Sequence, residues 1–256
     1  MWRASPPNPA DVKLLASARL KLDLTPLVIH DNYLINLASI DPTIRSKSIL
    51  CFRGELERAA AIGAEYLVAH PGSYKGQTLE EGIINFAHGL AEAAQGLALG
   101  NLMLLIECTA GGGCHIGSRF EELRAILDLA AGLTDLPIGY CLDTCHLLAA
   151  GFDIGSEAGL NRAIRDADRI LGMKNVKVIH ANDSKTPLGS RVDRHENIGQ
   201  GHIGEEGFRR ILAHPKLSKL PFILETPVDN EGDDIRNLET LKKLCPKSRT
   251  ITTKSN

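Results

Sequence analysis

Six short apolar runs recur along the chain at nearly constant intervals, and each run ends in His, Asp or Glu. The runs occupy residues 27–30, 66–70, 102–107, 138–143, 177–180 and 221–225. Their last residues are 40, 37, 36, 37 and 45 residues apart. Short runs that are apolar throughout are typical of strands that a parallel sheet buries on both faces.

Segments with helical periodicity separate these runs, at residues 11–21, 45–62, 78–98, 119–131, 157–171, 205–213 and 234–243. Regular βα units favour a barrel over a doubly wound sheet, and the first βα turn lacks the G-x-G-x-x-G motif of dinucleotide-binding folds. We therefore predict an α/β protein with a (β/α)8 TIM barrel. An eight-stranded barrel needs two more units, and helix 11–21 has no strand before it. We expect the first two βα units to be missing at the amino end.

Length and composition predict a single catalytic domain over residues 1–245, followed by a polar tail at 246–256. Six cysteines form no C-x-x-C pair, and the chain has neither a signal sequence nor a run of 18 apolar residues. These features predict a cytoplasmic protein that has no membrane partner, and we expect a monomer. A net charge of −2 argues against nucleic-acid binding through an excess of Lys and Arg, although bound cations would supply positive charge locally.

Active sites of βα barrels lie at the carboxyl ends of the strands. The residues at the six strand ends are His30, His70, Glu107, Asp143, His180 and Glu225. An isolated histidine in a strand is more often a hydrogen-bonded core residue than a metal ligand. Buried carboxylates such as Glu107 and Asp143 are costly unless they are paired or bind a metal, so we predict that the six side chains hold metal ions together.

Three more candidate ligands, His146, Asp193 and His195, lie just beyond strand ends. Asp193 and His195 are two residues apart, so an extended loop would point both side chains the same way. The nine residues comprise five histidines and four carboxylates, a mixture suited to zinc, with manganese as the alternative. Nine ligands are enough for two or three ions. Cys141 and Cys145 lie on either side of Asp143, but we do not expect thiolate ligation.

Seven motifs occur in order along the chain: HDNYLINL at residue 30, HPGS at 70, IECTAGGG at 106, LDTCH at 142, HANDS at 180, GSRVDRH at 189 and ILETP at 223. Together they resemble the endonuclease IV family of apurinic/apyrimidinic DNA-repair enzymes, over residues 2 to about 240. The resemblance implies a trinuclear zinc site that hydrolyses the phosphodiester 5′ to an abasic site in double-stranded DNA and leaves a 3′-hydroxyl.

The resemblance also implies a role for each residue. His30, His70 and Glu107 would bind the first zinc, and Glu107 would bridge to the second. Asp143, His180 and Glu225 would complete the second site, and His146, Asp193 and His195 would hold the third ion. Glu107 and Glu225 are the predicted catalytic residues. The predicted DNA contacts are Tyr33, Leu34, Lys75, Lys185, Arg191 and Arg194.

Two other functions fit parts of the pattern. A divalent-metal sugar isomerase or epimerase of the same barrel superfamily would also place His, Glu and Asp at strand ends. Such an enzyme would typically use one or two ions and would not need His146, Asp193 and His195. An inactive fragment or a chain that only binds DNA is the other alternative, since family members carry two further βα units before the position of Trp2.

Overall fold

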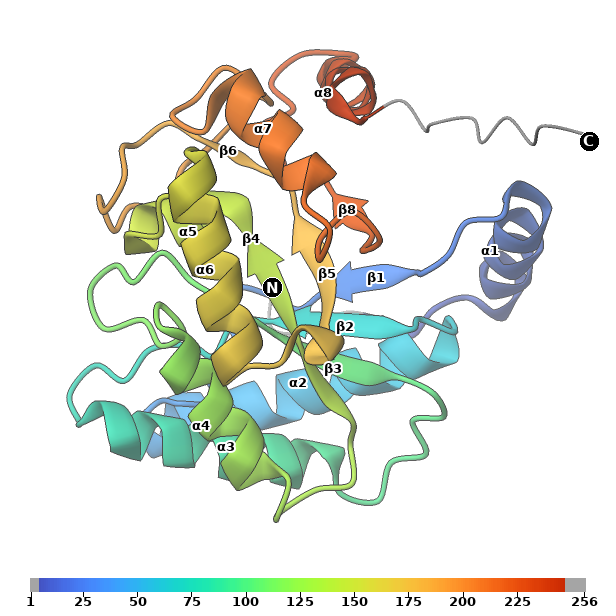
Figure 1. The fold of residues 1–256 in the computed structure, drawn as a ribbon. Coiled ribbons are helices and arrows are strands. Elements are labelled where there is room, and N and C mark those ends of the chain that lie inside the picture. Colours follow the sequence, from blue (N-terminus) through green and yellow to red (C-terminus); the bar gives the residue numbers. More distant parts are fainter. Residues whose placement is uncertain (1–4, 247–256) are drawn as a thin grey trace, which may run out of the picture.

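The computed structural model describes residues 5–246, and six parallel strands form one curved sheet at its centre (Figure 1). The strands are β1 (Val28–His30), β2 (Tyr66–Ala69), β3 (Met103–Glu107), β4 (Ile138–Asp143), β5 (Val176–His180) and β8 (Phe222–Ile223). They pair in the order β1-β2-β3-β4-β5-β8, so strands that follow one another in the barrel sequence are also neighbours in the sheet. The described residues thus provide six of the eight strands of a (β/α)8 barrel, as predicted.

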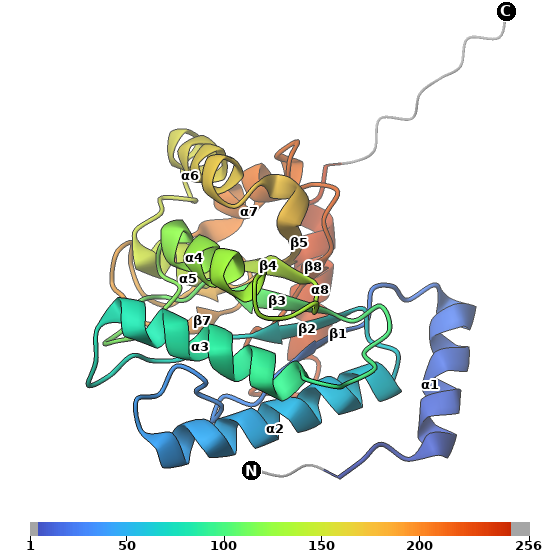
Figure 2. The ribbon, with the colours of Figure 1, turned by 90° about the horizontal axis from the view of Figure 1, so that it is seen from below.

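Helices cover the outer face of the sheet (Figures 1 and 2). The helices of the described residues are α1 (Pro9–Leu22), α2 (Pro42–Ala61), α3 (Leu79–Ala94), α4 (Phe120–Ala130), α5 (Thr144–Ala150), α6 (Glu157–Ile170), α7 (Gly204–Ala213) and α8 (Asp233–Leu244), with a 3-10 turn η1 (Met173–Asn175). A two-stranded hairpin, β6 (Asp183–Ser184) and β7 (His195–Glu196), follows β5. Helices α2, α3, α4, α6, α7 and α8 contact one another in that order along the chain.

Several helix ends have a local cause. Helix α2 begins three residues earlier than predicted, because the Asp41 carboxylate accepts the Thr43 N–H at 2.8 Å and Pro42 suits a first helical position. Helix α3 begins at a capping box of Thr78 and Glu81. It ends four residues before the predicted end, where Gly96 adopts φ +74° and turns the chain toward β3.

The sequence pattern did not predict helix α5 or the β6–β7 hairpin, and it placed Asp193 and His195 in an extended loop. Helix α5 has only seven residues, too few for a periodic signal, and each hairpin strand has two. Asp143 both ends β4 and caps α5, because its Oδ1 accepts the His146 N–H at 2.8 Å. One carboxylate thus makes the turn between the strand and the helix.

The sheet separates two hydrophobic regions of unequal size. The larger core lies between the sheet and the outer helices and includes Phe52, Phe86 and Phe208. A small cluster of buried apolar residues lies on the inner face, toward the barrel axis, and we call it the floor. Its buried members are Val68, Leu105, Cys141 and Val178. Val28 and Ile223, which are partly buried residues of the two edge strands β1 and β8, also pack against the floor.

Helix α1 lies apart from the other helices and buries none of its residues (Figure 2). Its attachment depends on Arg19, whose guanidinium donates to both carboxylate oxygens of Glu65 at 2.7 Å and to the Gly63 carbonyl at 3.0 Å. Glu65 also accepts the Leu27 N–H at 2.6 Å, next to β1. The Arg19 guanidinium therefore connects α1 to the edge of the sheet.

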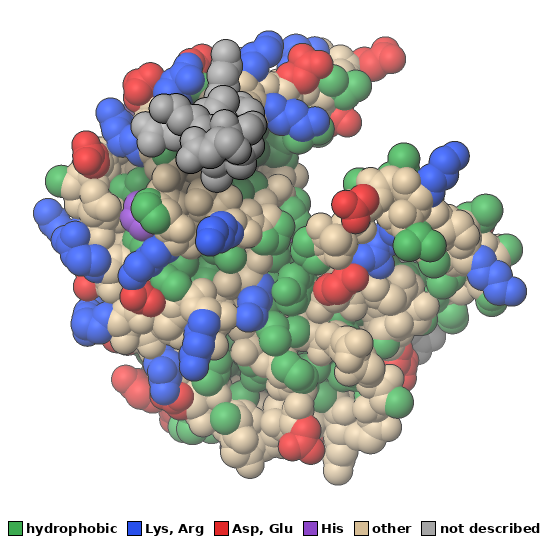
Figure 3. All heavy atoms as spheres, turned by 45° about the vertical axis from the view of Figure 1, so that its right-hand side comes forward, with side chains coloured by type: hydrophobic (Ala, Val, Ile, Leu, Met, Phe, Trp, Pro, Cys, Tyr) green, Lys and Arg blue, Asp and Glu red, His purple; other side chains and the backbone are tan. Residues whose placement is uncertain are grey.

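Basic and acidic side chains are intermixed on the face drawn in Figure 3, in keeping with a net charge of −2. No helix among residues 5–246 is long and apolar enough to cross a membrane. The predicted polar tail falls outside the described residues from 247 onward.

Candidate metal centre

The structure brings the nine predicted ligand side chains together at the carboxyl edge of the sheet. Alternation along the strands explains why, because residues two apart point to the same face. Val68, Leu105 and Val178 belong to the floor, so the residues two positions later point to the same side. These are His70, Glu107 and His180; His70 lies one residue past β2, while Glu107 and His180 end their strands. These ligand side chains therefore lie on the same face of the sheet as the floor.

Glu107 lies at the centre of the cluster and is fully buried. Its Oε2 lies 3.0 Å from His30 Nε2 and 3.1 Å from His70 Nε2. Its Oε1 lies 2.8 Å from His180 Nδ1 and 3.5 Å from His146 Nδ1. Each carboxylate oxygen therefore faces a different pair of imidazoles, the arrangement of a carboxylate that bridges two cations.

The surrounding charges set the protonation of this group. Burial alone would raise the pKa of Glu107, but the neighbouring His180, His70 and His146 outweigh burial and hold its pKa well below the ordinary value. Burial would also lower the pKa of His30, yet hydrogen bonds and charges from Asp31 and Glu107 raise it to about 11. Without a metal, the His30 ring is therefore protonated on both nitrogens and positively charged at neutral pH.

A second group shares Glu107 and adds Asp143, His180 and Glu225, whose ligand atoms all lie within 4.8 Å of one another. His180 Nδ1 lies 3.1 Å from Glu225 Oε2 as well as near Glu107. Burial would raise the pKa of Glu225, but the hydrogen bond and charge of His180 outweigh it and lower that pKa. Glu225 lies two residues beyond the end of β8 and is exposed, unlike the other three.

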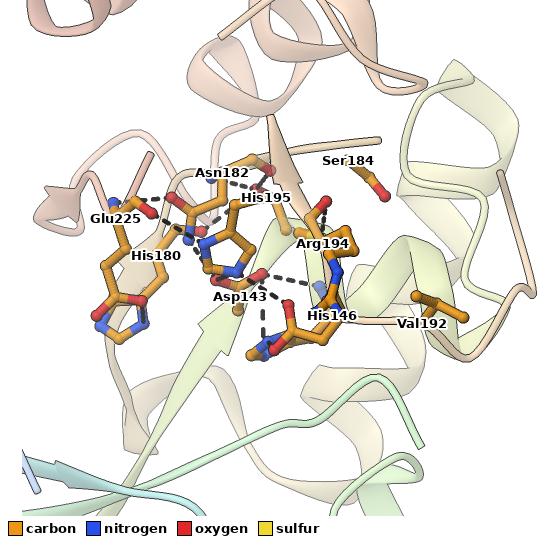
Figure 4. Close-up of polar contacts among 12 residues, drawn as sticks. Asp143, His146, His180, Asn182, Ser184, Val192, Arg194, His195 and Glu225 are labelled. Atoms are coloured by element: carbon orange, nitrogen blue, oxygen red, sulfur yellow. Dashed lines mark hydrogen bonds and ion pairs between the residues drawn. The ribbon is translucent and has the colours of Figure 1, made fainter. Parts of the chain in front are cut away.

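The third group combines helix α5 with the β6–β7 hairpin (Figure 4). His146 Nε2 lies 3.0 Å from Asp193 Oδ2, and His195 Nε2 lies 3.2 Å from Asp193 Oδ1. Asp143 also belongs here, because it groups with His146 and His195 within 4.8 Å. Asp143 therefore lies between the second and third groups, a position that sequence spacing did not reveal.

One buried atom in the third group lacks a hydrogen-bond partner. His195 Nε2 is buried and unpartnered, although it faces Asp193 and, at 3.8 Å, Asp143 Oδ2. Burial would lower the pKa of His195, but Asp193 and Asp143 raise it to about 9. A buried ring nitrogen with no partner, facing two carboxylates, is what a metal ligand offers.

Three histidines are oriented by a hydrogen bond between ring Nδ1 and a backbone carbonyl. His30 Nδ1 lies 2.9 Å from the Asp31 carbonyl, His146 Nδ1 lies 2.9 Å from the Cys108 carbonyl, and His195 Nδ1 lies 2.9 Å from the Glu225 carbonyl. Each N–H donates to its carbonyl, which leaves Nε2 as the free ligand atom. The residues present therefore fit divalent cations of the zinc type in their donor set and in the fixed orientation of their rings.

Two buried thiols lie beside the cluster, Cys141 near Glu107 and His180, and Cys145 near Asp193 and His195. Burial raises the pKa of Cys141 to about 12 and that of Cys145 to about 11. Both therefore hold their protons at neutral pH, and the thiolate is the form that binds metals. The exclusion of both thiols from the ligand set stays a prediction.

Sequence reasoning missed Asn182, which is completely buried among the ligands (Figure 4). Its Nδ2 donates to Asp143 Oδ2 at 2.6 Å, and its Oδ1 accepts the Glu225 N–H at 2.8 Å. The two bonds fix the direction of the amide, so Asn182 holds Asp143 and the backbone of Glu225 in one arrangement. Asn182 belongs to the HANDS motif, which could have indicated it. Its amide is not a typical metal ligand, so the pattern of His, Asp and Glu residues did not include it.

Replacing Asn182 by alanine is expected to weaken zinc binding about 10- to 100-fold, because partners of this kind orient metal ligands. Titration with zinc in competition with a chromogenic chelator would measure the change. Asn85→Ala is the matched control, since Asn85 donates to Gln77 Oε1 at 2.8 Å on helix α3, away from the cluster. Equal zinc affinity in the Asn182 variant and the control would contradict the orienting role.

The six predicted DNA contacts lie in three loops at the same end of the sheet as the cluster. Tyr33 and Leu34 follow β1, Lys75 follows β2, and Lys185, Arg191 and Arg194 lie between β6 and β7. Tyr33 has 87% of its surface exposed and lines a pocket of about 220 Å³ that also reaches His70. A larger cavity, about 690 Å³, lies between the carboxyl-terminal ends of α3 and α4 and contains none of the predicted site residues.

Comparison with known proteins agrees with this arrangement. Residues 2–244 match the model of the family described as xylose isomerase-like TIM barrel. A protein from Solibacter usitatus, named probable endonuclease 4, is 65% identical over 245 residues, which are 96% of this chain and 84% of that protein. A protein of the same name from Chloroflexus aurantiacus is 42% identical, over 95% of this chain and 85% of that protein.

Solved structures give the same result. The crystal structure of endonuclease IV from Thermus thermophilus matches with a TM-score of 0.81 and 38% identity, over 95% of this chain and 84% of that one. A D-tagatose 3-epimerase-like protein matches with a TM-score of 0.65 but only 20% identity, over 93% of this chain and 83% of that one, which shows the shared fold alone. The chain therefore belongs to the endonuclease IV family of the xylose isomerase-like TIM barrels.

Proposed function

We propose that this chain is a DNA-repair endonuclease that hydrolyses the phosphodiester 5′ to abasic sites in double-stranded DNA, with three zinc ions, and leaves a 3′-hydroxyl. Membership of the endonuclease IV family makes it a nuclease. Manganese is the alternative ion. Divalent ions in such a site activate water for attack on phosphorus and neutralise the charge that grows on the phosphoryl oxygens.

The observation that carries the proposal is the third group, in which His146, Asp193 and His195 come together beside the two groups that share Glu107. A barrel enzyme that binds one or two ions for sugar isomerisation has no use for these three side chains. Phosphodiester cleavage has a use for them, because a third cation can hold the phosphate while the other two act on the attacking and leaving oxygens.

The residues of the chain have distinct tasks in this proposal. Glu107 would bridge the first and second ions, since each of its oxygens faces a different pair of imidazoles. Glu225 would complete the second site, and its backbone carbonyl holds the His195 ring in place. The Nδ1–H groups of His30 and His146 remain on backbone carbonyls, so these rings present Nε2 to the ions.

The loops around the cluster would bind the duplex. Tyr33 and Leu34 would press into the helix at the lesion, where a missing base leaves room for a side chain. Lys75, Lys185, Arg191 and Arg194 would contact phosphates and fix the position of the strand. The cations supply local positive charge, so a chain with net charge −2 can approach a polyanion.

Incision of a duplex that carries one abasic site tests the proposal. We expect zinc-loaded protein to cut 5′ to the site, to leave the undamaged duplex intact and to lose activity with EDTA. Metal analysis of the same sample should give about three zinc ions per chain, which follows from the nine ligands. A preparation that binds a single manganese ion, epimerises ketoses and leaves the abasic duplex intact would contradict the proposal.

A further inference from the structure

Asp183, at the start of strand β6, is a completely buried carboxylate outside the predicted ligand set. It accepts five backbone N–H groups. Oδ1 binds the N–H groups of Ser184 at 2.8 Å and Ile203 at 2.9 Å. Oδ2 binds those of Gly199 at 3.0 Å, Gly201 at 2.9 Å and Gly204 at 3.2 Å. We call these five donors and the carboxylate the Asp183 cradle.

The cradle requires close approach of the backbone. A Cβ on Gly201 would collide with the Ser184 carbonyl and the Asp183 carboxylate, so only glycine fits there. Gly199 and Gly204 have φ values of +82° and +69°, which other residues rarely adopt. The segment 199–204 is therefore folded around the carboxylate, and it leads directly into α7.

The same segment continues the chain that carries two ligands of the third group. Strand β7 starts at His195, and its two residues pair with β6, with Ser184 opposite His195 and Asp183 opposite Glu196. Next to this pairing, the Lys185 N–H donates to the Arg194 carbonyl at 2.9 Å. The chain from Asp193 to Gly204 is thus attached to β6 at its beginning by the hairpin and at its end by the cradle.

Asp193 is the ligand of the third group that needs this attachment most. Glu107, Asp143 and His180 lie on long strands inside the sheet, whereas Asp193 lies in a loop with half of its side chain exposed. A loop-borne ligand keeps its position only if the loop is held. The cradle supplies hydrogen bonds to a charged acceptor, which are about twice as strong as neutral ones.

We propose that Asp183 is a positioning residue for the third metal site, acting through the segment that follows His195. The inference rests on the proposed function, because it assumes that His146, Asp193 and His195 bind an ion. Replacing the carboxylate by an amide would leave one acceptor oxygen and turn an NH₂ group toward backbone N–H donors. The loop would loosen while the strand-borne ligands stay in place.

Zinc retention tests the inference. Zinc-loaded wild type, Asp183→Asn and Gly201→Ala would be dialysed against graded concentrations of EDTA, and the remaining zinc would be counted per chain. We expect both variants to release one ion at an EDTA concentration about 10- to 100-fold lower than wild type does, with the other two ions released as in wild type. Asp183→Asn changes the acceptor of the cradle, and Gly201→Ala changes the segment that carries the donors. If Asp183→Asn does not fold, the zinc retention of Gly201→Ala tests the inference.

Glu122→Gln is the matched control, since Glu122 is another buried carboxylate that accepts backbone N–H groups, from Gly117 at 2.6 Å and Ser118 at 3.1 Å. That loop carries none of the nine ligands, so this control should lose stability without losing an ion. Release of all three ions together, or three ions held as in wild type, would overturn the role of Asp183. A wild type with fewer than three ions would overturn the proposed metal content, and the inference with it.

Discussion

Replacing Glu107 by glutamine is expected to lower the rate of abasic-site incision about 10³-fold or more. The carboxylate lies 3.1 Å or less from the ring nitrogens of His30, His70 and His180, so it is shared by two groups of ligands. An amide has the same shape but no charge, and its NH₂ group cannot bind a cation. Both ions that it would bridge should therefore bind less tightly.

Single-turnover incision at saturating zinc measures this effect, and metal analysis of the same samples shows whether ions are lost. Glu65→Gln is a suitable control, because Glu65 binds Arg19 at the other end of β2 and is remote from the cluster. This control should reduce stability without slowing incision. Incision at the wild-type rate in Glu107→Gln would refute the assignment of Glu107 as the shared ligand.

Zinc binding to metal-free protein is expected to release protons and to tighten steeply as the pH rises. His30 and His195 have pKa values raised to about 11 and about 9, because neighbouring carboxylates outweigh the effect of burial. Both are protonated at pH 7, and zinc needs the neutral ring. His30 and His195 would bind different ions, so each of these two ions would displace one such proton, and the affinity for each should rise roughly 10-fold per pH unit between pH 6 and 8.

Calorimetric titration with zinc in two buffers that differ in ionisation enthalpy counts the protons released. Binding without proton release at pH 7 would contradict the assigned ion pairs.

The pKa shifts also predict how the stability of the metal-free protein depends on pH. The raised histidine pKa values stabilise the fold fully below about pH 6.5, and this stability is lost as the pH rises toward 9–11. Zinc should remove that loss, because the rings then bind the ion instead of protons.

The strand framework was predictable because buried parallel strands form apolar runs that are hard to mistake. All six predicted strands occur, with ends shifted by no more than two residues. The structure adds features that depend on contacts between distant residues. Helix α5 exists because the Asp143 carboxylate caps it, and the β6–β7 hairpin is held by pairing that two residues per strand cannot signal.

The candidate site also has a part that the sequence predicts and a part that only the structure shows. Residues of ligand type at strand ends could be found from spacing alone, and the structure brings all nine together. Spacing does not describe the contacts of Asn182 and Asp183, because both side chains form hydrogen bonds with groups that are distant in sequence. The position of Asp143 between two groups depends on the turn into α5, which spacing does not describe. The assignment of individual ligands and DNA contacts stays a prediction.

The two hydrophobic regions on either side of the sheet have a consequence for how such barrels diverge. Among residues 5–246, most of the buried apolar side chains lie between the sheet and the helices, and four of them, Val68, Leu105, Cys141 and Val178, lie beneath the cluster. Exchanges at the strand ends therefore leave the larger core untouched. Residues at the strand ends can change without redesign of the scaffold, and this chain shares its fold with a D-tagatose 3-epimerase-like protein that is only 20% identical to it.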